Sequence, residues 1–317
     1  MPLKLQIDAL EAELAGVEAL LGEASEIGDT VGKLQYQQRA DELRAELDRL
    51  YTLHSPFASV ALYFNGEPVL GSRGIAADFA GRALDTFQEI VSKVYAKCEL
   101  GTIGERGRVP LQDSAGLMIT GVTHGSFGFV LDELSDQEEL HDTALKEVIH
   151  SVSQLLEDIG ADSEQKFEST IEDIDARTLI ALRNFFKDMD TASATVRLVD
   201  DERDFTLDEG AIHRGRLRTE ATQIKEDTQS VEGNLLGFLP EHRRFELQVA
   251  SGEVVYGTAS MEAAEQVQEA VESGNFVVGG ANSWCVGNVI VRTVQPLNRT
   301  ARITYRLVEF TKLGNAG

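Results

Sequence analysis

Apolar residues recur at spacings of three and four along the first fifty residues, and this spacing most constrains how the chain can fold. Such spacing places the side chains on one face of an α-helix, with Glu, Asp, Arg and Gln filling the other positions over residues 3 to 53, as in a coiled coil. The apolar stripe consists of Leu10, Leu14, Val17, Leu21, Leu43, Leu47 and Leu50. It is predicted to bind a partner, either the chain's own body or a second copy.

The stripe is interrupted by the segment GEASEIGDTVG, which contains three glycines. Each glycine weakens a helix interior by about 1 kcal/mol. The segment is therefore either a hairpin loop between two antiparallel helices or a hinge in one long helix. The helical region ends at His54-Ser55-Pro56, because proline disfavours helix in the residue before it. Residues 1–54 are predicted to form a helical hairpin or coiled-coil arm.

Residues 55–190 mix the two kinds of apolar pattern. Amphipathic helices are predicted over residues 76–97, 136–158 and 164–187, and short apolar strands lie before and between them. This order of elements is typical of an α+β domain.

Residues 191–317 have a different texture, with short alternating strands and a single inserted helix that Gly274 ends. Turns are expected at Pro240-Glu241 and Ser251-Gly252. The pattern over residues 231–311, about a quarter of the chain, resembles a small barrel of the OB or SH3-like kind. The resemblance implies a β-rich, partly open barrel domain. The fold class is thus α+β: a helical arm, a central α+β domain and a C-terminal β-rich, small-barrel-like domain.

The charge and the cysteines narrow the range of functions. Asp and Glu number 53 against 29 Lys and Arg, a net charge of −24, which disfavours general nucleic-acid binding. The acidity is interpreted as a source of solubility or as complementary to a basic protein partner. The two cysteines form no CxxC motif. No signal peptide and no apolar run long enough for a membrane span is found, so a cytoplasmic protein is expected.

The stretch His124-Gly125-Ser126-Phe127-Gly128 is one residue away from the G-x-S-x-G motif of nucleophilic serines. That motif requires a helix after the serine. Here the following residues alternate like a strand, so a glycine-rich turn is predicted and no catalytic residue is assigned.

Two glycine-rich loops carry arginines in this acidic chain. Arg73 lies in GSRG, and Arg106 and Arg108 lie in GERGRVP. Arginine with backbone amides can hold a phosphate or a carboxylate. If the loops converge with His124 and Ser126, they form an anion site. The alternative is solvated loops whose arginines pair with nearby acids.

No metal or cofactor is predicted. The Glu-x-x-His pairs at Glu138/His141 and Glu147/His150 have the spacing of di-iron bundles, but both lie on one helix. The acidic run DMDTASATVRLVDDERD lacks the order of a calcium loop and is interpreted as a solvated linker and turn.

These observations favour a non-enzymatic interaction or scaffold protein that acts by self-association or by docking in an assembly. The apolar stripe and Trp284, the only tryptophan, are the predicted partner-binding residues. One alternative is a small-molecule-binding or hydrolytic enzyme that uses the arginine loops, His124 and Ser126. Another is a nucleic-acid-binding accessory protein, because Arg243, Arg244, Trp284 and Tyr305 are residue types that bind single strands.

Overall fold

The computed structural model describes residues 1–101, 107–123, 127–135, 139, 141–274, 276–280, 283–295 and 301–312. The described residues combine helices with two five-stranded sheets, so the predicted mixture of α and β structure is confirmed. The chain divides into two compact units. The sheet unit comprises Met1–Ile103, Arg108–Asp173 and Ile180–Arg216, and the barrel unit comprises Gly104–Gly107, Ile174–Leu179 and Leu217–Gly317.

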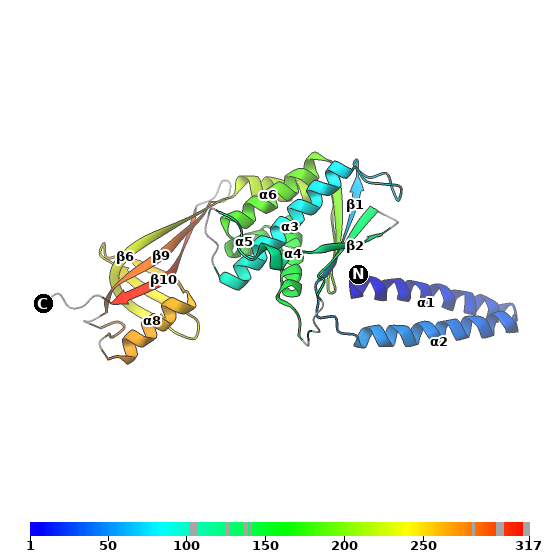
Figure 1. Ribbon diagram of the computed structural model, residues 1–317, viewed down its shortest axis with the longest axis horizontal. Coiled ribbons are helices and arrows are strands. Elements are labelled where there is room, and N and C mark those ends of the chain that lie inside the picture. Colours follow the sequence, from blue (N-terminus) through cyan, green and yellow to red (C-terminus); the bar gives the residue numbers. More distant parts are fainter. Residues whose placement is uncertain are drawn as a thin grey trace. The chain divides into compact units, whose positions relative to one another are not determined.

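The first fifty residues form two helices, α1 (Leu3–Glu26) and α2 (Thr30–Thr52), that run side by side (Figure 1). Gly28 has a φ of 76°, which lets the chain reverse between the helices. Asp29 caps α2 by accepting hydrogen bonds from the backbone amides of Val31 and Gly32. Of the two arrangements predicted for this segment, the structure has the helical hairpin.

The central sheet has the strand order β2-β3-β1-β4-β5, and every neighbouring pair is antiparallel. Its strands are β1 (Ser59–Gly66), β2 (Met118–Thr123), β3 (Phe127–Asp132), β4 (Ala194–Val199) and β5 (Asp204–Leu207). The strand β4 pairs with β1, with Leu62 opposite Leu198 and Phe64 opposite Val196. Residues 191–216, which were predicted to begin the C-terminal domain, therefore belong largely to the sheet unit.

Helices cover one face of this sheet (Figure 1). The helices of this region are α3 (Ala77–Leu100), α4 (Ala144–Gly160), α5 (Glu164–Asp173), which packs against α4, α6 (Ala176–Thr191) and α7 (Glu209–Ala221), with a short 3-10 helix over Gln112–Ala115. The residues predicted as one helix over 164–187 form α5 and α6. Phe64 of β1 meets Phe79 of α3 edge to face, with ring centroids 5.6 Å apart, in the core between sheet and helices.

The barrel unit contains five strands in the cyclic order β10-β8-β7-β6-β9. They are β6 (Gln223–Leu239), β7 (Arg244–Val249), β8 (Val254–Ala259), β9 (Trp284–Gln295) and β10 (Arg302–Lys312). Only β8 and β10 pair in parallel, and helix α8 (Met261–Glu272) connects β8 to β9. The ring closes because each strand pairs with two others. Phe245, Leu247, Val289 and Leu307 are buried inside it.

Candidate binding sites

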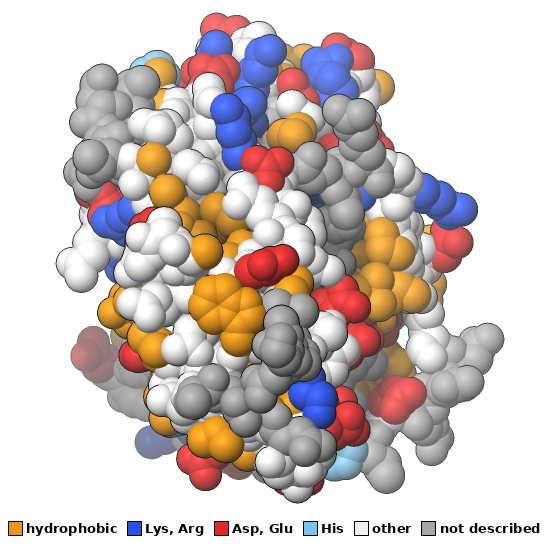
Figure 2. Space-filling model, turned by 90° about the vertical axis from the view of Figure 1, so that its left-hand side faces the viewer, with side chains coloured by type: hydrophobic (Ala, Val, Ile, Leu, Met, Phe, Trp, Pro, Cys, Tyr) orange, Lys and Arg blue, Asp and Glu red, His pale blue; other side chains and the backbone are white. Residues whose placement is uncertain are grey.

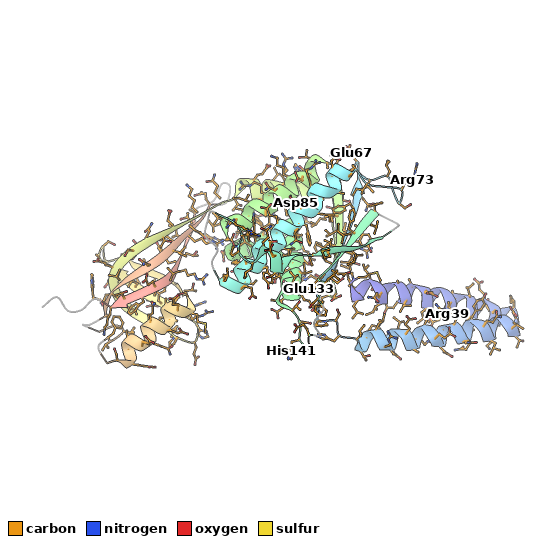
Figure 3. The ribbon with its side chains drawn as sticks, in the orientation of Figure 1. Arg39, Glu67, Arg73, Asp85, Glu133 and His141 are labelled. Atoms are coloured by element: carbon orange, nitrogen blue, oxygen red, sulfur yellow. The ribbon has the colours of Figure 1, made fainter. Side chains whose placement is uncertain are left out.

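The predicted anion site lies partly outside the described residues, since Arg106, His124 and Ser126 are not among them. Arg73 is exposed in the segment between β1 and α3, and Figure 3 shows it pointing away from the sheet. Arg108 follows α3 and lies 3.2 Å from the carboxylate of Asp113, with both side chains exposed. The described arginines are thus separated along the chain by the whole of α3, and their convergence with the serine turn stays a prediction.

The apolar stripe of the arm is used within the chain. Leu43, Leu47 and Leu50 of α2 are buried, and the stripe of α1 is partly buried. Ion pairs join the same two helices: Arg39 lies 2.7 Å from Glu13, and Arg44 lies 2.7 Å from Glu18. The two halves of the stripe therefore cover each other. The large apolar side chains that remain exposed near the hairpin tip are Ile27, Val31 and Leu34.

The barrel unit has an open cavity of 720 Å³ on the outer face of β7 and β8. In the antiparallel pair, Arg244 lies opposite Thr258 and Glu246 lies opposite Tyr256, so these four side chains share the outer face. The ring of Tyr256 is 63% exposed, and Phe238 and Leu239 at the end of β6 complete the apolar lining. This surface is called the barrel face below. Figure 2 looks onto the barrel and shows hydrophobic side chains exposed among charged ones.

The barrel segment differs in charge from the rest of the chain. Residues 217–317 contain nine Lys and Arg against twelve Asp and Glu, a net charge of −3. Residues 1–216 contain twenty against forty-one, a net charge of −21. Arg243 and Arg244 are exposed in the turn before β7 and at its first residue. The acidity of the chain is therefore concentrated outside the barrel segment.

Trp284 is 42% exposed at the start of β9, opposite Asn234 of β6. It is not among the residues that line the cavity on the barrel face. The predicted aromatic contact residue is therefore not part of the lining that Tyr256 and Phe238 share.

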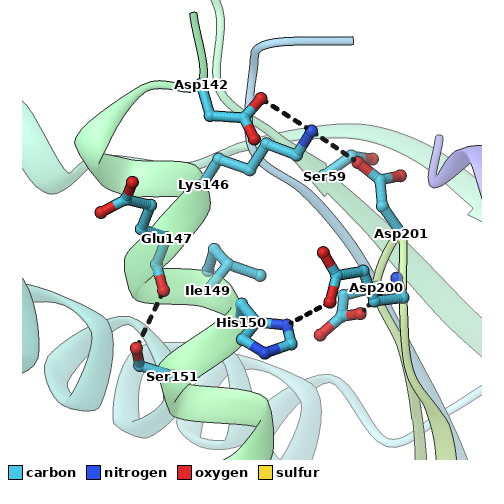
Figure 4. Close-up of a pocket in the computed structure, with 10 residues that line it drawn as sticks. Ser59, Asp142, Lys146, Glu147, Ile149, His150, Ser151, Asp200 and Asp201 are labelled. Atoms are coloured by element: carbon cyan, nitrogen blue, oxygen red, sulfur yellow. Dashed lines mark hydrogen bonds and ion pairs between the residues drawn. The ribbon is translucent and has the colours of Figure 1, made fainter. Parts of the chain in front are cut away.

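A second cavity, of 240 Å³, lies in the sheet unit between α4 and the chain that leaves β4 (Figure 4). This acidic pocket is lined by Ser59, Asp142, Lys146, Glu147, Ile149, His150, Ser151, Asp200, Asp201 and Glu202. Lys146 and His150 are four residues apart and therefore lie on one face of α4. The sequence predicts the helix but not the carboxylates that the side chains of Lys146 and His150 meet.

The carboxylates near Lys146 are partnered. The Nζ atom of Lys146 lies 3.0 Å from Asp142 and 3.8 Å from Asp201, and it donates to the backbone carbonyl of Ser55. Asp201 also accepts a hydrogen bond of 2.7 Å from the backbone amide of Leu3, at the start of α1. Burial raises the pKa of Asp201, against the lowering effect of these two contacts.

The carboxylates near His150 are only partly partnered. The Nδ1 atom of His150 lies 3.2 Å from an oxygen of Glu202. Asp200 is 3% exposed, and its Oδ1 atom accepts hydrogen bonds from the backbone amides of Glu202 and Arg203. Its Oδ2 atom is buried and receives no hydrogen bond from any described residue. Figure 4 shows Asp200 and His150 close together on the two sides of the pocket.

The acidic run that contains Asp200 was predicted to be a solvated linker, and this prediction is wrong for Asp200. The apolar run before it forms β4, which is central in the sheet, and the chain turns as soon as the strand ends. The turn buries the first carboxylate against α4. One signal in the sequence could have indicated the burial of Asp200. Asp200 and Asp201 directly follow the apolar residues Leu198 and Val199 that end the strand, with no glycine or proline between them.

Within the described ranges, no cluster of three or more His, Cys, Asp or Glu side chains has an arrangement that could hold a metal ion. Likewise, none of the described helices is both long enough and apolar enough to span a membrane. No family model matches the chain, and no curated protein or solved structure matches it significantly. The barrel face, the arm and the acidic pocket are therefore the features from which a function can be inferred.

Proposed function

We propose that the protein is a non-enzymatic binding protein whose barrel face holds single-stranded nucleic acid. The observation that carries the proposal is the exposed side chain of Tyr256, which lines an open cavity on the outer face of β7 and β8 together with Arg244, its diagonal neighbour across the two strands. Proteins that bind single strands stack bases on aromatic side chains and hold the phosphates with nearby arginines.

The order of the strands supports this use of the face. The first barrel strand pairs with the second and the fourth, the third pairs in parallel with the fifth, and a helix connects the third to the fourth. This is the order expected for an OB barrel, whose second and third strands form the usual binding face for oligonucleotides and oligosaccharides. In this chain those strands are β7 and β8.

The local charge also supports the proposal. Electrostatic attraction between exposed charges extends only about 8 Å at physiological ionic strength, so the acids of the sheet unit act on the barrel face only where they are close to it. Arg243 and Arg244 can contact phosphate groups, although Glu246 places one carboxylate on the same face. Affinity is therefore expected to be modest and to fall as the salt concentration rises.

The test is fluorescence anisotropy of the full chain with a labelled single-stranded oligothymidine, compared with the duplex and with a neutral oligosaccharide. Substitution Tyr256→Ala is expected to weaken binding of the single strand by about 5- to 100-fold, the usual worth of one stacked base. Tyr256→Phe keeps the ring and is expected to bind like the wild type.

Trp284→Ala is the matched control, because it removes another exposed aromatic side chain from the same unit, one that does not line the cavity. It is expected to leave the affinity unchanged. Equal losses in Tyr256→Ala and Trp284→Ala, or no binding by the wild type at low salt, would contradict the proposal. Tight binding of the oligosaccharide alone would assign the face to sugars.

A second candidate function is self-association or docking in a protein assembly through the tip of the arm. Ile27 is 80% exposed, Val31 68% and Leu34 72%, and they follow one another along the end of α1 and the start of α2. Neighbouring exposed apolar side chains are a common feature of protein interfaces. In this candidate the contact surface is the hairpin tip. The apolar stripe, which was the predicted contact surface, is covered by packing between the two helices of the arm.

Light scattering after size-exclusion chromatography tests the second candidate over a range of concentrations. A wild-type oligomer that becomes monomeric in the double substitution Ile27→Asp and Leu34→Asp would support it. The matched control is Leu70→Asp, which is 71% exposed in the segment after β1. A wild-type protein that stays monomeric at every concentration would rule out self-association through the tip.

A further inference from the structure

The acidic pocket contains a buried acceptor to which the described part of the chain supplies no donor. Asp200 is 3% exposed, and no described residue donates a hydrogen bond to its Oδ2 atom. Removing a carboxylate oxygen from water without a donor in exchange is unfavourable. Since Oδ1 already accepts two backbone hydrogen bonds, the side chain is held in place, and Oδ2 is the oxygen of this lining residue that keeps an unused acceptor.

The remaining lining gives the pocket an excess of negative charge. It contains five carboxylates, from Asp142, Glu147, Asp200, Asp201 and Glu202, against the single ammonium group of Lys146 and one histidine ring. Lys146 lies close to Asp142 and Asp201 only. Asp200, Glu202 and the exposed Glu147 therefore have no lysine or arginine partner among the lining residues.

Lys146 illustrates what this environment offers a cation. Its ammonium group is held by the carboxylate of Asp142 and by the backbone carbonyl of Ser55. An ammonium group has three donors and needs acceptors in several directions. The His150 side of the pocket has carboxylate oxygens of the same kind but no ammonium group, and Ile149 supplies an apolar contact for a methylene chain.

We propose that the acidic pocket binds a primary alkylammonium group, supplied by a short aliphatic diamine or by a lysine side chain. Asp200 accepts a charge-assisted hydrogen bond through Oδ2, and Glu202 and Glu147 add attraction at the rim. The volume of 240 Å³ is below the roughly 300–1,000 Å³ of pockets for larger ligands, so one end of a thin chain suits it. The described residues offer no metal-binding cluster here, which favours an organic cation.

The experiment is a titration of the full chain with butane-1,4-diamine at an ionic strength of about 0.15 M. Binding is measured by isothermal titration calorimetry and by the changes in backbone amide chemical shifts. Saturable binding below about 10 mM, with shifts confined to residues of the pocket, is expected. Tetramethylammonium has the charge but no N–H donor, and it is expected to bind at least about ten-fold more weakly.

The decisive variant is Asp200→Asn, which keeps an oxygen for the two backbone hydrogen bonds and replaces Oδ2 by a donor. It is expected to weaken diamine binding by about ten-fold or more. The matched control is Asp85→Asn, which removes the same charge from an exposed position on α3 (Figure 3) and is expected to change the affinity less than about two-fold. Glu147→Gln removes one negative charge from the rim of the pocket at an exposed position, so the buried core of the sheet unit is not affected. It is expected to weaken diamine binding by about two- to five-fold.

One further probe, a blocked lysine, separates the two sources of the ammonium group. Tighter binding of the diamine indicates a free amine, whereas tighter binding of N-acetyl-lysine N-methylamide indicates a lysine side chain of a protein. No saturable binding of either probe would overturn the proposal. Equal weakening by Asp200→Asn and Asp85→Asn, or equal binding of tetramethylammonium, would also overturn it, because the affinity would then reflect only the overall charge.

Discussion

The barrel segment and the sheet unit differ in charge and in the kind of ligand that their surfaces suit. Residues 217–317 have a net charge of −3 and present exposed aromatic and arginine side chains on one face of the barrel. Residues 1–216 have a net charge of −21 and enclose a pocket with a buried, unpartnered carboxylate oxygen. The comparison teaches that the total charge of −24 is a poor guide to either surface, because screening makes charge a local property.

The largest effect is expected from a substitution that opens the barrel. A side chain at Gly257 would overlap the backbone carbonyl of Tyr305, where β8 and β10 pair and close the ring. Gly257→Val is therefore expected to destabilise the barrel by about 3 kcal/mol or more. Fluorescence of Trp284, the only tryptophan, follows the unfolding of this unit.

The control for the opened barrel lies in the sheet unit. Gly81 of α3 has no atom within 4 Å of where a Cβ would lie, so Gly81→Ala is expected to stabilise that unit by up to about 1 kcal/mol. If the midpoint of thermal unfolding, measured by the fluorescence of Trp284, is the same in Gly257→Val and in the wild type, the closed ring of strands is contradicted.

The rates at which the two cysteines react with a thiol reagent provide a second comparison of the two units. Cys98 is exposed, although partial burial raises the pKa of its thiol, whereas Cys285 is buried in the barrel and burial raises its pKa further, to about 12. Because the thiolate is the reactive form, Cys285 is expected to react at least about 100-fold more slowly than Cys98 at pH 8. Mass spectrometry of the modified peptides measures both rates, and Cys98→Ser isolates the slow one. Equal rates would show that the barrel interior is open to solvent.

A smaller effect is expected from removing one arginine from the barrel face. If Arg244 contacts a phosphate, Arg244→Gln is expected to weaken single-strand binding by about three-fold and to reduce the slope of log K against log salt by about 0.7. The matched substitution Arg73→Gln removes an exposed arginine from the sheet unit and is expected to change neither value. If the slope of log K against log salt changes in Arg73→Gln but not in Arg244→Gln, the phosphate contacts would be assigned to the arginine loops instead of the barrel face.

The smallest effect concerns an ion pair on the sheet. Arg197 donates two hydrogen bonds to Asp204, and they hold the pKa of Asp204 below its ordinary value. Because the folded-state pKa is lowered, the pair stabilises the fold above the unfolded pKa of about 3.9 and loses this effect as the pH falls through the lower folded value. Asp204→Asn is expected to lower the free energy of unfolding by less than about 1 kcal/mol at pH 7 and to leave it nearly unchanged at about pH 2.

Chemical denaturation at the two pH values measures this difference. The control is Asp113→Asn, since the side chain of Asp113 is 92% exposed and its pair with Arg108 is open to solvent. A cost of Asp204→Asn that is the same at both pH values would assign the effect to packing instead of charge.

The arm and the barrel show how much of the fold was predictable. The spacing of Leu43, Leu47 and Leu50 predicts a helix, and the glycines around Gly28 predict the break where the hairpin turns. In the barrel, the alternation along β7 and β8 and the stop at Gly274 indicate the elements, because helix periodicity and turn chemistry are local properties of the chain.

The candidate sites were less predictable, because each depends on elements that are distant in sequence. Arg243, Arg244 and Trp284 were recognised as residue types that bind single strands, but only the pairing of β7 with β8 places Tyr256 beside Arg244. The acidic run was noticed but interpreted as solvated, since no local pattern tells a buried carboxylate from an exposed one.

The sequence alone predicts the helical arm, the mixed central region and the β-rich C-terminal region, and it gives the net charge. The folded chain adds that β4 joins β1 in the first sheet, that the barrel strands close into a ring, and that Asp200 is buried in the pocket that His150 also lines. The two differ because periodicity acts over a few neighbouring residues, whereas strand partners and burial are set by packing between segments far apart along the chain.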